Sequence, residues 1–216
     1  GCTGFVYALS VAEKFLLSPD NKYTLVIGAE MCSRMVDYSD RNTAILFGDG
    51  AGAAVVGRGD GGNGILSAYL GADGRGARHL YMPAGGSAIP ASHETVENKM
   101  HFARMNGQEI FKFATSIIPE VGDRLLGEAG LRYEDIDFFV PHQANLRIIK
   151  TAIKRSEIPL EKTLLNIQKY GNMSVACIPV ALSEAELEGK LKAGDLVLMI
   201  AFGAGLTFGG ILLRWG

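Results

Sequence analysis

Three side chains of this sequence, a cysteine, a histidine and an asparagine, have the types and positions that thiol chemistry requires. Cys2 stands directly ahead of an apolar stretch of helical period, and His142 and Asn172 follow in two later turns framed by glycine or proline. The thiolate of a cysteine is its nucleophilic form. The trio is therefore the arrangement that a thiol enzyme needs to hold an acyl group and then drive carbon chemistry on it.

The first of these side chains stands at the start of a predicted helix. Apolar residues recur at helical spacing after Cys2, namely Phe5, Ala8, Leu9, Ala12 and Leu16. At a helix N-terminus the free backbone N–H groups and the helix dipole favour the thiolate over the thiol. Most cysteines in an apolar intracellular chain are buried structural residues, so the position at a helix start is what favours a reactive thiol at Cys2.

His142 and Asn172 each have a structural interpretation as well. His142 follows a predicted buried strand, where side chains project into a cleft, yet a lone histidine is more often a satisfied structural residue. Asn172 precedes a predicted helix, where asparagine commonly accepts hydrogen bonds from the N–H groups of the first turn. Taken singly, neither residue decides between structure and chemistry.

The composition is that of an ordinary soluble globular protein. The 216 residues are 48% hydrophobic and 20% charged, with a formal net charge of −2, and the sequence pI is about 6.1. Lys and Arg form no block interleaved with aromatic residues, which argues against nucleic-acid binding. No apolar run reaches membrane-spanning length, and we expect no signal peptide. Cys2, Cys32 and Cys177 are odd in number and widely spaced, which suits reduced thiols in a cytoplasm.

Hydrophobic periodicity predicts alternating helices and strands. After the first helix we expect strands at residues 23–28, 44–47, 51–56 and 65–70, a turn at 48–50, and a surface excursion with little structure at 71–99. Helices are predicted at 107–128, interrupted or restarted at Pro119, and at 146–155. The remaining predicted elements are strands at 137–140 and 164–167, a helix from Asn172 to about Glu188, and closing strands at 196–201 and 207–213.

One structural unit occurs twice in these predictions. A helix, a strand, a glycine-rich turn and a second strand follow Cys2, and the same order follows Asn172. The interval from Cys2 to Thr24 is 22 residues and that from Asn172 to Leu196 is 24 residues. Duplicated halves would bring two helix N-termini to one central site. The repeat predicts a pseudo-twofold α/β architecture with layers of helix and mixed sheet.

Two other patterns carry less weight. Residues 57–62 fit a dinucleotide-binding glycine pattern, but a strand is predicted at 65–70, where that motif requires a helix. His79, His93 and His101 are spaced by 14 and 8 residues, which matches no compact metal-ligand pattern, and no cysteine joins them. We therefore expect neither a dinucleotide site nor a metal site.

Several long motifs, in order, make the sequence resemble a known family. They are Cys-x-Gly-Phe at 2–5, Asp-Arg-x-Thr at 40–43, Phe-Gly-Asp-Gly-Ala-Gly-Ala-Ala at 47–54, Pro-His-Gln-Ala-Asn-Leu-Arg-Ile at 141–148 and Gly-Asn at 171–172. These motifs span nearly the whole chain. They resemble those of the β-ketoacyl-acyl carrier protein synthase III family, the initiating condensing enzymes of the thiolase superfamily.

The resemblance implies a thiolase-like α/β fold of αβαβα layers with pseudo-twofold duplicated halves. Residues 1–64 would be the remainder of an N-terminal half that carries Cys2, and residues 65–216 a C-terminal half that carries His142 and Asn172. A nucleophile at a helix N-terminus normally follows a buried strand, yet only Gly1 precedes Cys2. We therefore expect the chain to be a fragment whose N-terminal half is incomplete and which is inactive alone.

The resemblance also assigns roles to the trio. Cys2 would accept an acyl group from a coenzyme A thioester, and His142 and Asn172 would donate hydrogen bonds to the malonyl thioester carbonyl as carbon dioxide leaves. The backbone N–H groups of Cys2 and Ala204 would hold the tetrahedral oxyanion. Ala204 stands where the family usually has a glycine. The backbone N–H remains a donor after a change from glycine to alanine, unless the position needs a positive φ.

Substrate contacts and partners follow from the same resemblance. Arg41 and Asn145 resemble coenzyme A contacts, and Phe47 resembles part of the acyl pocket. The implied substrates are an acyl-CoA primer and malonyl-acyl carrier protein, whose malonyl group is linked through phosphopantetheine. The resemblance implies no cofactor and no metal, and it implies a cytoplasmic homodimer that binds neither nucleic acid nor membrane.

A basic helical face follows the histidine motif. Arg147, Lys150 and Lys154 recur at offsets of three and seven, with Arg155 beside them. The plainer interpretation is a solvated basic face. Beside a thioester cleft, the same face would dock an acidic carrier protein and guide its phosphopantetheine arm.

Two other functions stay open at this point. Type III polyketide synthases of the chalcone-synthase kind also use Cys, His and Asn, and residues 170–174 and 176–177 favour that enzyme. Residues 142–145 and the basic helix favour the carrier-dependent synthase, and the extender used, malonyl-carrier protein or malonyl-CoA, would separate the two. The third alternative is a non-catalytic dimerising fragment. The acyl primer is not predicted by the sequence.

Overall fold

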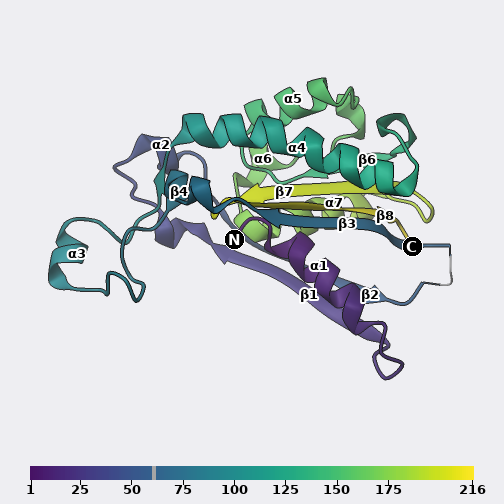
Figure 1. The fold of residues 1–216 in the computed structure, drawn as a ribbon, viewed down its shortest axis with the longest axis horizontal. Helices are drawn as coiled ribbons and strands as arrows, with labels where there is room; N and C mark the ends of the chain where they lie inside the picture. The colour runs from purple at the N-terminus through teal and green to yellow at the C-terminus, as the bar shows by residue number, and fades with distance from the viewer. Residues whose placement is uncertain (60–61) are drawn as a thin grey trace.

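The computed structural model of the protein describes residues 1–59 and 62–216. Helices and strands alternate along these residues (Figure 1). The α-helices are α1 (Gly4–Phe15), α2 (Arg41–Ala44), α3 (His93–Glu97), α4 (Gly107–Ala129), α5 (Leu146–Arg155), α6 (Ile167–Tyr170) and α7 (Cys177–Leu187). The strands are β1 (Tyr23–Met31), β2 (Asp49–Gly57), β3 (Gly64–Ala72), β4 (Leu80–Tyr81), β5 (Arg104–Met105), β6 (Phe138–Pro141), β7 (Leu196–Gly203) and β8 (Thr207–Arg214). Short 3₁₀ helices are η1 (Cys32–Met35), η2 (Gly74–His79), η3 (Tyr133–Asp135), η4 (Leu160–Lys162) and η5 (Ser174–Ala176).

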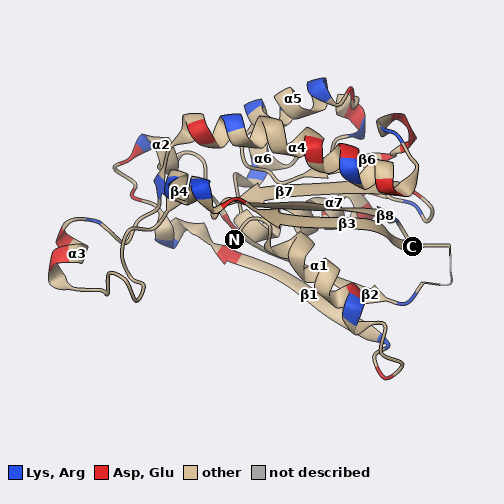
Figure 2. Cartoon of the chain, viewed as in Figure 1, with Lys and Arg blue, Asp and Glu red and all other residues tan. Residues whose placement is uncertain are grey.

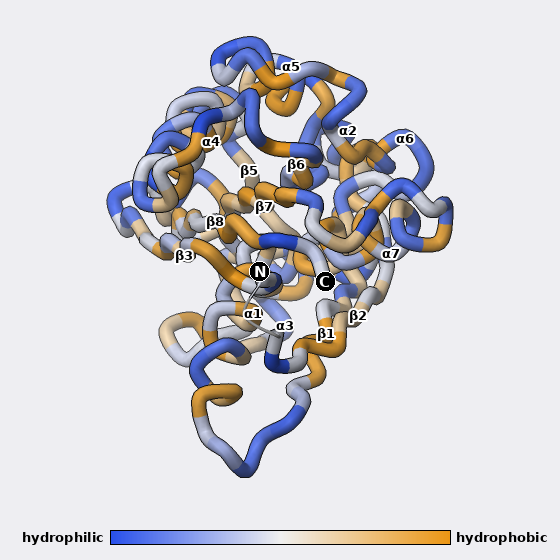
Figure 3. Tube along the Cα trace, turned by 90° about the vertical axis from the view of Figure 1, so that its right-hand side faces the viewer, coloured by the Kyte–Doolittle hydropathy of each residue, from blue (hydrophilic) through white to orange (hydrophobic). Residues whose placement is uncertain are grey.

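A four-stranded mixed sheet forms the centre of the fold. Its strand order is β3-β8-β7-β6, with β8 antiparallel to both of its neighbours and β6 parallel to β7. Every residue of β7 is buried, as expected for a strand covered on both faces, whose sequence is a continuous apolar run. Figure 3 shows this apolar character along the central strands.

Helices cover both faces of this sheet, and a second sheet adds a fourth layer. On one face α4 and α5 pack on Leu198, Ile200 and Leu212, and on the other α1 and α7 pack on Val197, Met199 and other β7 and β8 residues. The antiparallel pair β1-β2 contacts the far side of α1 and α7. The layers therefore run α, β, α, β (Figure 1), which confirms the predicted layered α/β fold.

The predicted repeat is present as two helix and hairpin units. Helix α1 is followed by the antiparallel pair β1-β2, and α7 is followed by the antiparallel pair β7-β8. Strand β3 pairs with β8 and not with β1 or β2. The strand predicted at 65–70 is therefore confirmed, but it belongs to the central sheet.

Apolar surface is exposed on the outer strands. Tyr23, Leu25 and Ile27 of β1 and Val55 of β2 are each more than half exposed. A separate apolar groove of about 1130 Å³ lies between α1, α7 and the neighbouring ends of β2 and β3. None of the predicted site residues lines that groove, so the chemistry must be sought elsewhere.

The strand predicted at 44–47 is wrong. Residues 41–44 form helix α2 instead, because Asp40 caps it: its carboxylate accepts a hydrogen bond from the N–H of Asn42 at 3.0 Å. The predicted turn at 48–50 is wrong as well, because β2 begins at Asp49. Glycines in β2 permit close packing: a Cβ on Gly50 would clash with the sulfur of Met173, and one on Gly52 would lie 2.9 Å from the backbone nitrogen of Val180 in α7.

The strand predicted at 164–167 and the helix start at Asn172 are also wrong. Only Thr163 forms a bridge with the neighbouring strand, because the N–H groups of Asn166 and Ile167 bond to the side chain of Gln143. A 3₁₀ turn begins at Ser174 and the α-helix at Cys177. Asn172 therefore lies in the loop ahead of the helix.

Helix α4 runs through Pro119 without the predicted interruption. A proline lacks the N–H that would bond to the carbonyl of the residue four positions earlier, here Thr115. The guanidinium of Arg155 in α5 donates to that carbonyl oxygen at 2.6 Å. The contact satisfies the acceptor that Pro119 leaves free, and it ties α5 to α4.

The segment predicted as a poorly structured excursion contains short elements. Helix η2, strand β4 and helix α3 lie within residues 71–99, and Ser92 and Thr95 form a capping box at the start of α3. The glycine pattern at 57–62 includes residues 60–61, which lie outside the described residues. The strand predicted after it is β3, as stated above.

Candidate functional site

Cys2 lies in the turn ahead of α1 and is half-buried. It lies against Gly203 at the end of β7, where a Cβ would be only 2.9 Å from the Cβ of Cys2. Burial raises the pKa of the Cys2 thiol above its ordinary value, and the hydrogen bond from the Ser174 hydroxyl opposes that rise. Desolvation therefore opposes the effect that we expected the helix start to have on this thiol.

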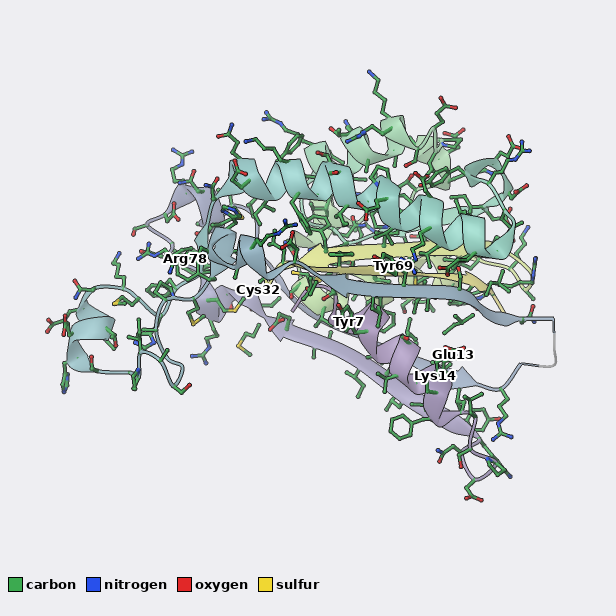
Figure 4. All side chains as sticks on the ribbon, in the orientation of Figure 1. Tyr7, Glu13, Lys14, Cys32, Tyr69 and Arg78 are labelled. Atoms are coloured by element: carbon green, nitrogen blue, oxygen red, sulfur yellow. The ribbon has the colours of Figure 1, made fainter. Side chains whose placement is uncertain are left out.

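The other two cysteines are buried. Cys32 follows β1 (Figure 4), and burial together with the nearby Glu30 raises its pKa to about 12. Cys177 opens α7, and its sulfur accepts a hydrogen bond from the N–H of Met173 at 3.2 Å. Cys2 is thus the accessible thiol among the three free cysteines of the described chain.

His142 follows the last residue of β6 and is 2% exposed. The backbone N–H of His142 donates to the backbone carbonyl of Ile200 in β7 at 2.8 Å. The imidazole ring packs edge-on against the ring of Phe202, with the two centroids 5.6 Å apart. The ring nitrogen Nδ1 is buried and has no hydrogen-bond partner in the described part of the chain. His142 is therefore fixed at the same end of β7 as Cys2.

Asn172 is held by its backbone and its side chain. It forms a bridge with Phe47, and its carbonyl accepts a hydrogen bond from the N–H of Gly48 at 2.9 Å. Its Oδ1 accepts from the N–H of Ser174 at 2.9 Å and lies 3.8 Å from the sulfur of Cys177. The amide is thereby oriented with its oxygen toward the start of α7.

Ser174 connects Asn172 to Cys2. Its N–H bonds to Asn172, as above, and its Oγ lies 3.5 Å from the sulfur of Cys2. The His142 ring contacts Phe202, and the next residue in the chain, Gly203, lies against Cys2. The structure therefore brings the three predicted residues to one end of the central sheet.

Gln143 ties the loop of His142 to the loop that leads to Asn172. Its side chain is fully buried and makes four hydrogen bonds to the backbone. The amide nitrogen donates to the carbonyls of Pro141 and Leu164 at 2.8 and 3.1 Å, and Oε1 accepts from the N–H groups of Asn166 and Ile167, each at 3.2 Å. Every one of these backbone groups would lose a partner without it.

Replacing Gln143 by Met should therefore destabilise the protein. A buried backbone group left without a partner costs about 1–3 kcal/mol, so we expect a loss of about 3 kcal/mol or more, measured by denaturant unfolding. The matched control is Gln168→Met, because Gln168 is exposed and donates to a single carbonyl at 3.3 Å. Equal stabilities of the two variants would contradict the role of Gln143.

A chain of hydroxyl contacts joins Cys2's neighbour to the predicted oxyanion donor Ala204. Thr3 is 4% exposed, and its hydroxyl lies 2.8 Å from that of Thr207. The Thr207 hydroxyl also donates to the carbonyl of Ala204 at 3.2 Å. Positive φ in this turn occurs at Gly205, where it is 135°, and not at Ala204, so alanine is compatible with the position.

Of the predicted substrate residues, Phe47 pairs with Asn172 of the site. Arg41 is exposed at the start of α2, and Phe47 is half-buried beside Asn172. Asn145 is the N-cap of α5, with Oδ1 accepting from the N–H of Arg147 at 2.8 Å. The side-chain oxygen of Asn145 thus has a structural use.

The predicted basic face is present on α5. Arg147, Lys150 and Lys154 are exposed, whereas Ile149 and Ala152 are buried; Figure 2 shows the cationic residues of α5 on its outward side. Arg155, which we had grouped with them, uses its guanidinium to bond to α4. Arg147, Lys150 and Lys154 are called the basic face below.

Two of the histidines set aside in the sequence, His79 and His101, make local contacts. The Nε2 of His101 lies 2.9 Å from the Thr95 hydroxyl, and the carbonyl of His79 accepts from the N–H of Asn106. Within residues 1–59 and 62–216, no group of three or more His, Cys, Asp or Glu side chains is placed to hold a metal ion. No helix of this described part is long and apolar enough to cross a membrane.

Sequence reasoning missed several residues that build the site. Gln143 lies inside the motif at 141–148, and Ser174 follows the motif at 171–172. The motifs therefore include or adjoin both residues, but they do not reveal which atoms the two side chains contact. Thr3 and Thr207 are 204 positions apart. The sequence pattern predicts Phe202 only as a residue of a core strand. Its contact with the ring of His142 is seen only in the fold.

Known protein families and relatives match this chain. The family model of 3-oxoacyl-[acyl-carrier-protein (ACP)] synthase III matches residues 1–74, and that of its C terminal matches residues 126–215, together more than half of the chain. The Beta-ketoacyl-[acyl-carrier-protein] synthase III of Syntrophomonas wolfei is 70% identical over 100% of this chain. The chain spans 65% of the length of that curated relative.

Solved structures match with high similarity. The structure of a β-ketoacyl-[acyl carrier protein] synthase III from Thermus thermophilus is 44% identical with a TM-score of 0.90, covering 100% of this chain and 66% of that one. A further crystal structure of a 3-oxoacyl-(acyl-carrier-protein) synthase III is 31% identical with a TM-score of 0.92, covering 100% of this chain and 67% of that one. The similarity extends over the fold and the whole described site.

Proposed function

Because the chain belongs to the 3-oxoacyl-[acyl-carrier-protein] synthase III family, we propose that it catalyses the condensation that initiates fatty acid synthesis. The substrates are an acyl-CoA primer and malonyl-acyl carrier protein. The observation that supports this most is the meeting of Cys2 and Asn172 at Ser174, with His142 at the same end of β7. The accessible thiol and two fixed polar side chains supply the parts that a two-step acyl condensation requires.

The first step is acyl transfer to Cys2. The thiolate attacks the thioester carbonyl of the primer, the sulfur–carbon bond forms, and coenzyme A leaves as its thiolate. The backbone N–H groups of Cys2 and Ala204 stabilise the oxyanion of the tetrahedral intermediate. Contacts of Thr3 and Thr207 hold the two segments that carry these donors.

The second step is decarboxylative condensation. The bond between the malonyl carboxylate and its α-carbon breaks, carbon dioxide leaves, and the electron pair forms an enolate of the thioester. His142 and Asn172 donate hydrogen bonds to the enolate oxygen. The α-carbon then attacks the acyl group, and the Cys2 sulfur leaves as a thiolate. The step needs no external oxidant and no cofactor.

The position of the His142 ring supports a donor role for its other nitrogen. Nδ1 is buried without a partner in the described chain. An unpaired acceptor is better tolerated in a protein interior than an unpaired N–H. The proton therefore belongs on Nε2, the tautomer that donates to a substrate carbonyl.

The remaining predicted residues take substrate and carrier roles in this proposal. Arg41 and Asn145 contact coenzyme A and Phe47 lines the acyl pocket. The enzyme acts in the cytoplasm, which the three free cysteines support, and as a homodimer, for which the exposed apolar residues of β1 and β2 provide surface.

The test of the function is a condensation assay with the intact protein. An acyl-CoA with malonyl-carrier protein should give the β-ketoacyl-carrier product, identified by mass spectrometry, with little product when malonyl-CoA replaces the carrier-linked extender. Equal or better use of malonyl-CoA would favour a type III polyketide synthase, and no product with either extender would contradict both enzymes.

The basic face provides a second test. Reversing charge in an Arg147→Glu, Lys154→Glu variant should raise KM for malonyl-carrier protein on the order of tenfold at low salt, because electrostatic attraction steers the acidic carrier. Acyl transfer from coenzyme A should change less. Reversal of two exposed cations outside α5, Lys22→Glu and Lys192→Glu, is the matched control. A uniform loss with both substrates would point to misfolding or a shared pocket role.

A further inference from the structure

Ser174 has a backbone conformation that serine rarely adopts. Its φ is 51°, in the left-handed region, and it is 5% exposed at the start of η5. Non-glycine residues persist in such conformations only where surrounding contacts hold them, and these positions cluster at functional sites. The conformation directs attention to what Ser174 contacts.

Both polar groups of Ser174 contact members of the trio. Its N–H donates to Oδ1 of Asn172 at 2.9 Å, and its Oγ donates to the sulfur of Cys2 at 3.5 Å. The contact with Cys2 spans 172 positions in the sequence. A residue with the usual negative φ would not present both groups in the same directions.

We propose that the Ser174 hydroxyl stabilises the thiolate of Cys2, while the Ser174 N–H holds the Asn172 amide with its nitrogen toward the substrate. The proposal rests on the proposed function, in which Cys2 is the nucleophile. When Cys2 ionises, its proton leaves for solvent and the electron pair stays on sulfur. Ser174 keeps its own proton and donates a hydrogen bond, so it is not a base.

The electrostatic surroundings of Cys2 give this hydrogen bond a purpose. Burial raises the pKa of the thiol, and Glu30 on β1 adds to the rise. The hydrogen bond from the Ser174 hydroxyl lowers it, and Cys32 also interacts electrostatically with Cys2. A hydrogen bond to a charged acceptor is stronger than one to a neutral acceptor, so Ser174 favours the ionised form.

The pH profile of Cys2 tests the proposal without any substrate. Ionisation is followed by the ultraviolet absorbance of the thiolate, with a Cys2→Ser variant as background, and by the rate of carbamidomethylation of Cys2 with iodoacetamide. Ser174→Ala should raise the apparent pKa, leaving about tenfold less thiolate at neutral pH. Because thiolate increases with pH, the two profiles should converge at high pH.

Two variants make the outcome decisive. Ser174→Gly also removes the hydroxyl, and glycine adopts the positive φ without strain. This variant should therefore show the same rise in the apparent pKa of Cys2 as Ser174→Ala. Ser67→Ala removes another buried hydroxyl, one that donates to the carbonyl of Leu125 at 2.9 Å, and should leave the profile of Cys2 unchanged. The inference fails if Ser174→Ala and Ser174→Gly superimpose on wild type, or if Ser67→Ala shifts equally.

The experiment separates this inference from the proposed function. If Cys2 is acylated by acyl-CoA and the Ser174 variants titrate as wild type, the function stands and the role of Ser174 is wrong. If the variants shift but acyl-CoA never labels Cys2 of the wild-type protein, the contact is real and the proposed function is wrong. Near-ultraviolet circular dichroism checks that every variant is folded.

Discussion

A Cys2→Ser variant incubated with an acyl-CoA should show no acyl-enzyme by intact-mass spectrometry. A serine hydroxyl ionises far less readily than a thiol, and burial at this position opposes ionisation further, as the raised pKa of Cys2 indicates. Condensation should fall on the order of a thousandfold or more, as when a covalent nucleophile is removed from other enzymes.

A matched control distinguishes the loss of this thiol from a general effect of removing cysteine. Cys32→Ala removes a buried thiol whose pKa is raised to about 12, so this variant should still be acylated once. Persistent acyl-enzyme in Cys2→Ser would show that another residue is the nucleophile.

Replacing His142 or Asn172 by Ala should separate the two chemical steps. Acylation of Cys2 should be retained, whereas decarboxylation of malonyl-carrier protein should slow on the order of a hundredfold or more, the usual cost of one oxyanion donor. The measurement is release of carbon dioxide beside intact-mass detection of acyl-enzyme. Decarboxylation at the wild-type rate in both variants would make these residues structural.

Asn172→Asp sharpens that result. Aspartate keeps an oxygen to accept the N–H of Ser174, which Asn172 does at 2.9 Å, but it loses the amide N–H donor. The variant should therefore fold like wild type and still be slow in decarboxylation. A fast Asn172→Asp enzyme would show that Asn172 acts through its oxygen alone.

Periodicity in the sequence predicts the layered fold, and the motifs shared with a known family single out Cys2, His142 and Asn172 as candidates. The apolar runs of β7 and β8 and the period of α1 are local signals, and the repeated order of elements predicts their assembly. Each of Cys2, His142 and Asn172 lies in a turn or loop beside such an element, but their chemical roles follow from the resemblance to a known family.

Contacts between distant residues account for several of the differences from these predictions, whereas helix α2 depends on the local cap by Asp40. Helix α4 continues through Pro119 because Arg155 bonds to the exposed carbonyl. Asn166 and Ile167 do not pair as a strand because their N–H groups bond to the side chain of Gln143. The pKa of Cys2 depends on how deeply the folded chain buries it. None of these partners is near its target in the sequence, so no local pattern carries the information.

In the proposed function, the four hydrogen bonds of Gln143 determine when His142 and Asn172 are brought together. They join the loop of His142 to the segment that leads to Asn172, so opening either loop would leave buried groups of the other without partners. The two loops should therefore move as one cooperative unit. The entropy cost of bringing the proposed donors His142 and Asn172 together is then incurred once, when the chain folds. Each turnover in the proposed function would begin with both side chains already in place.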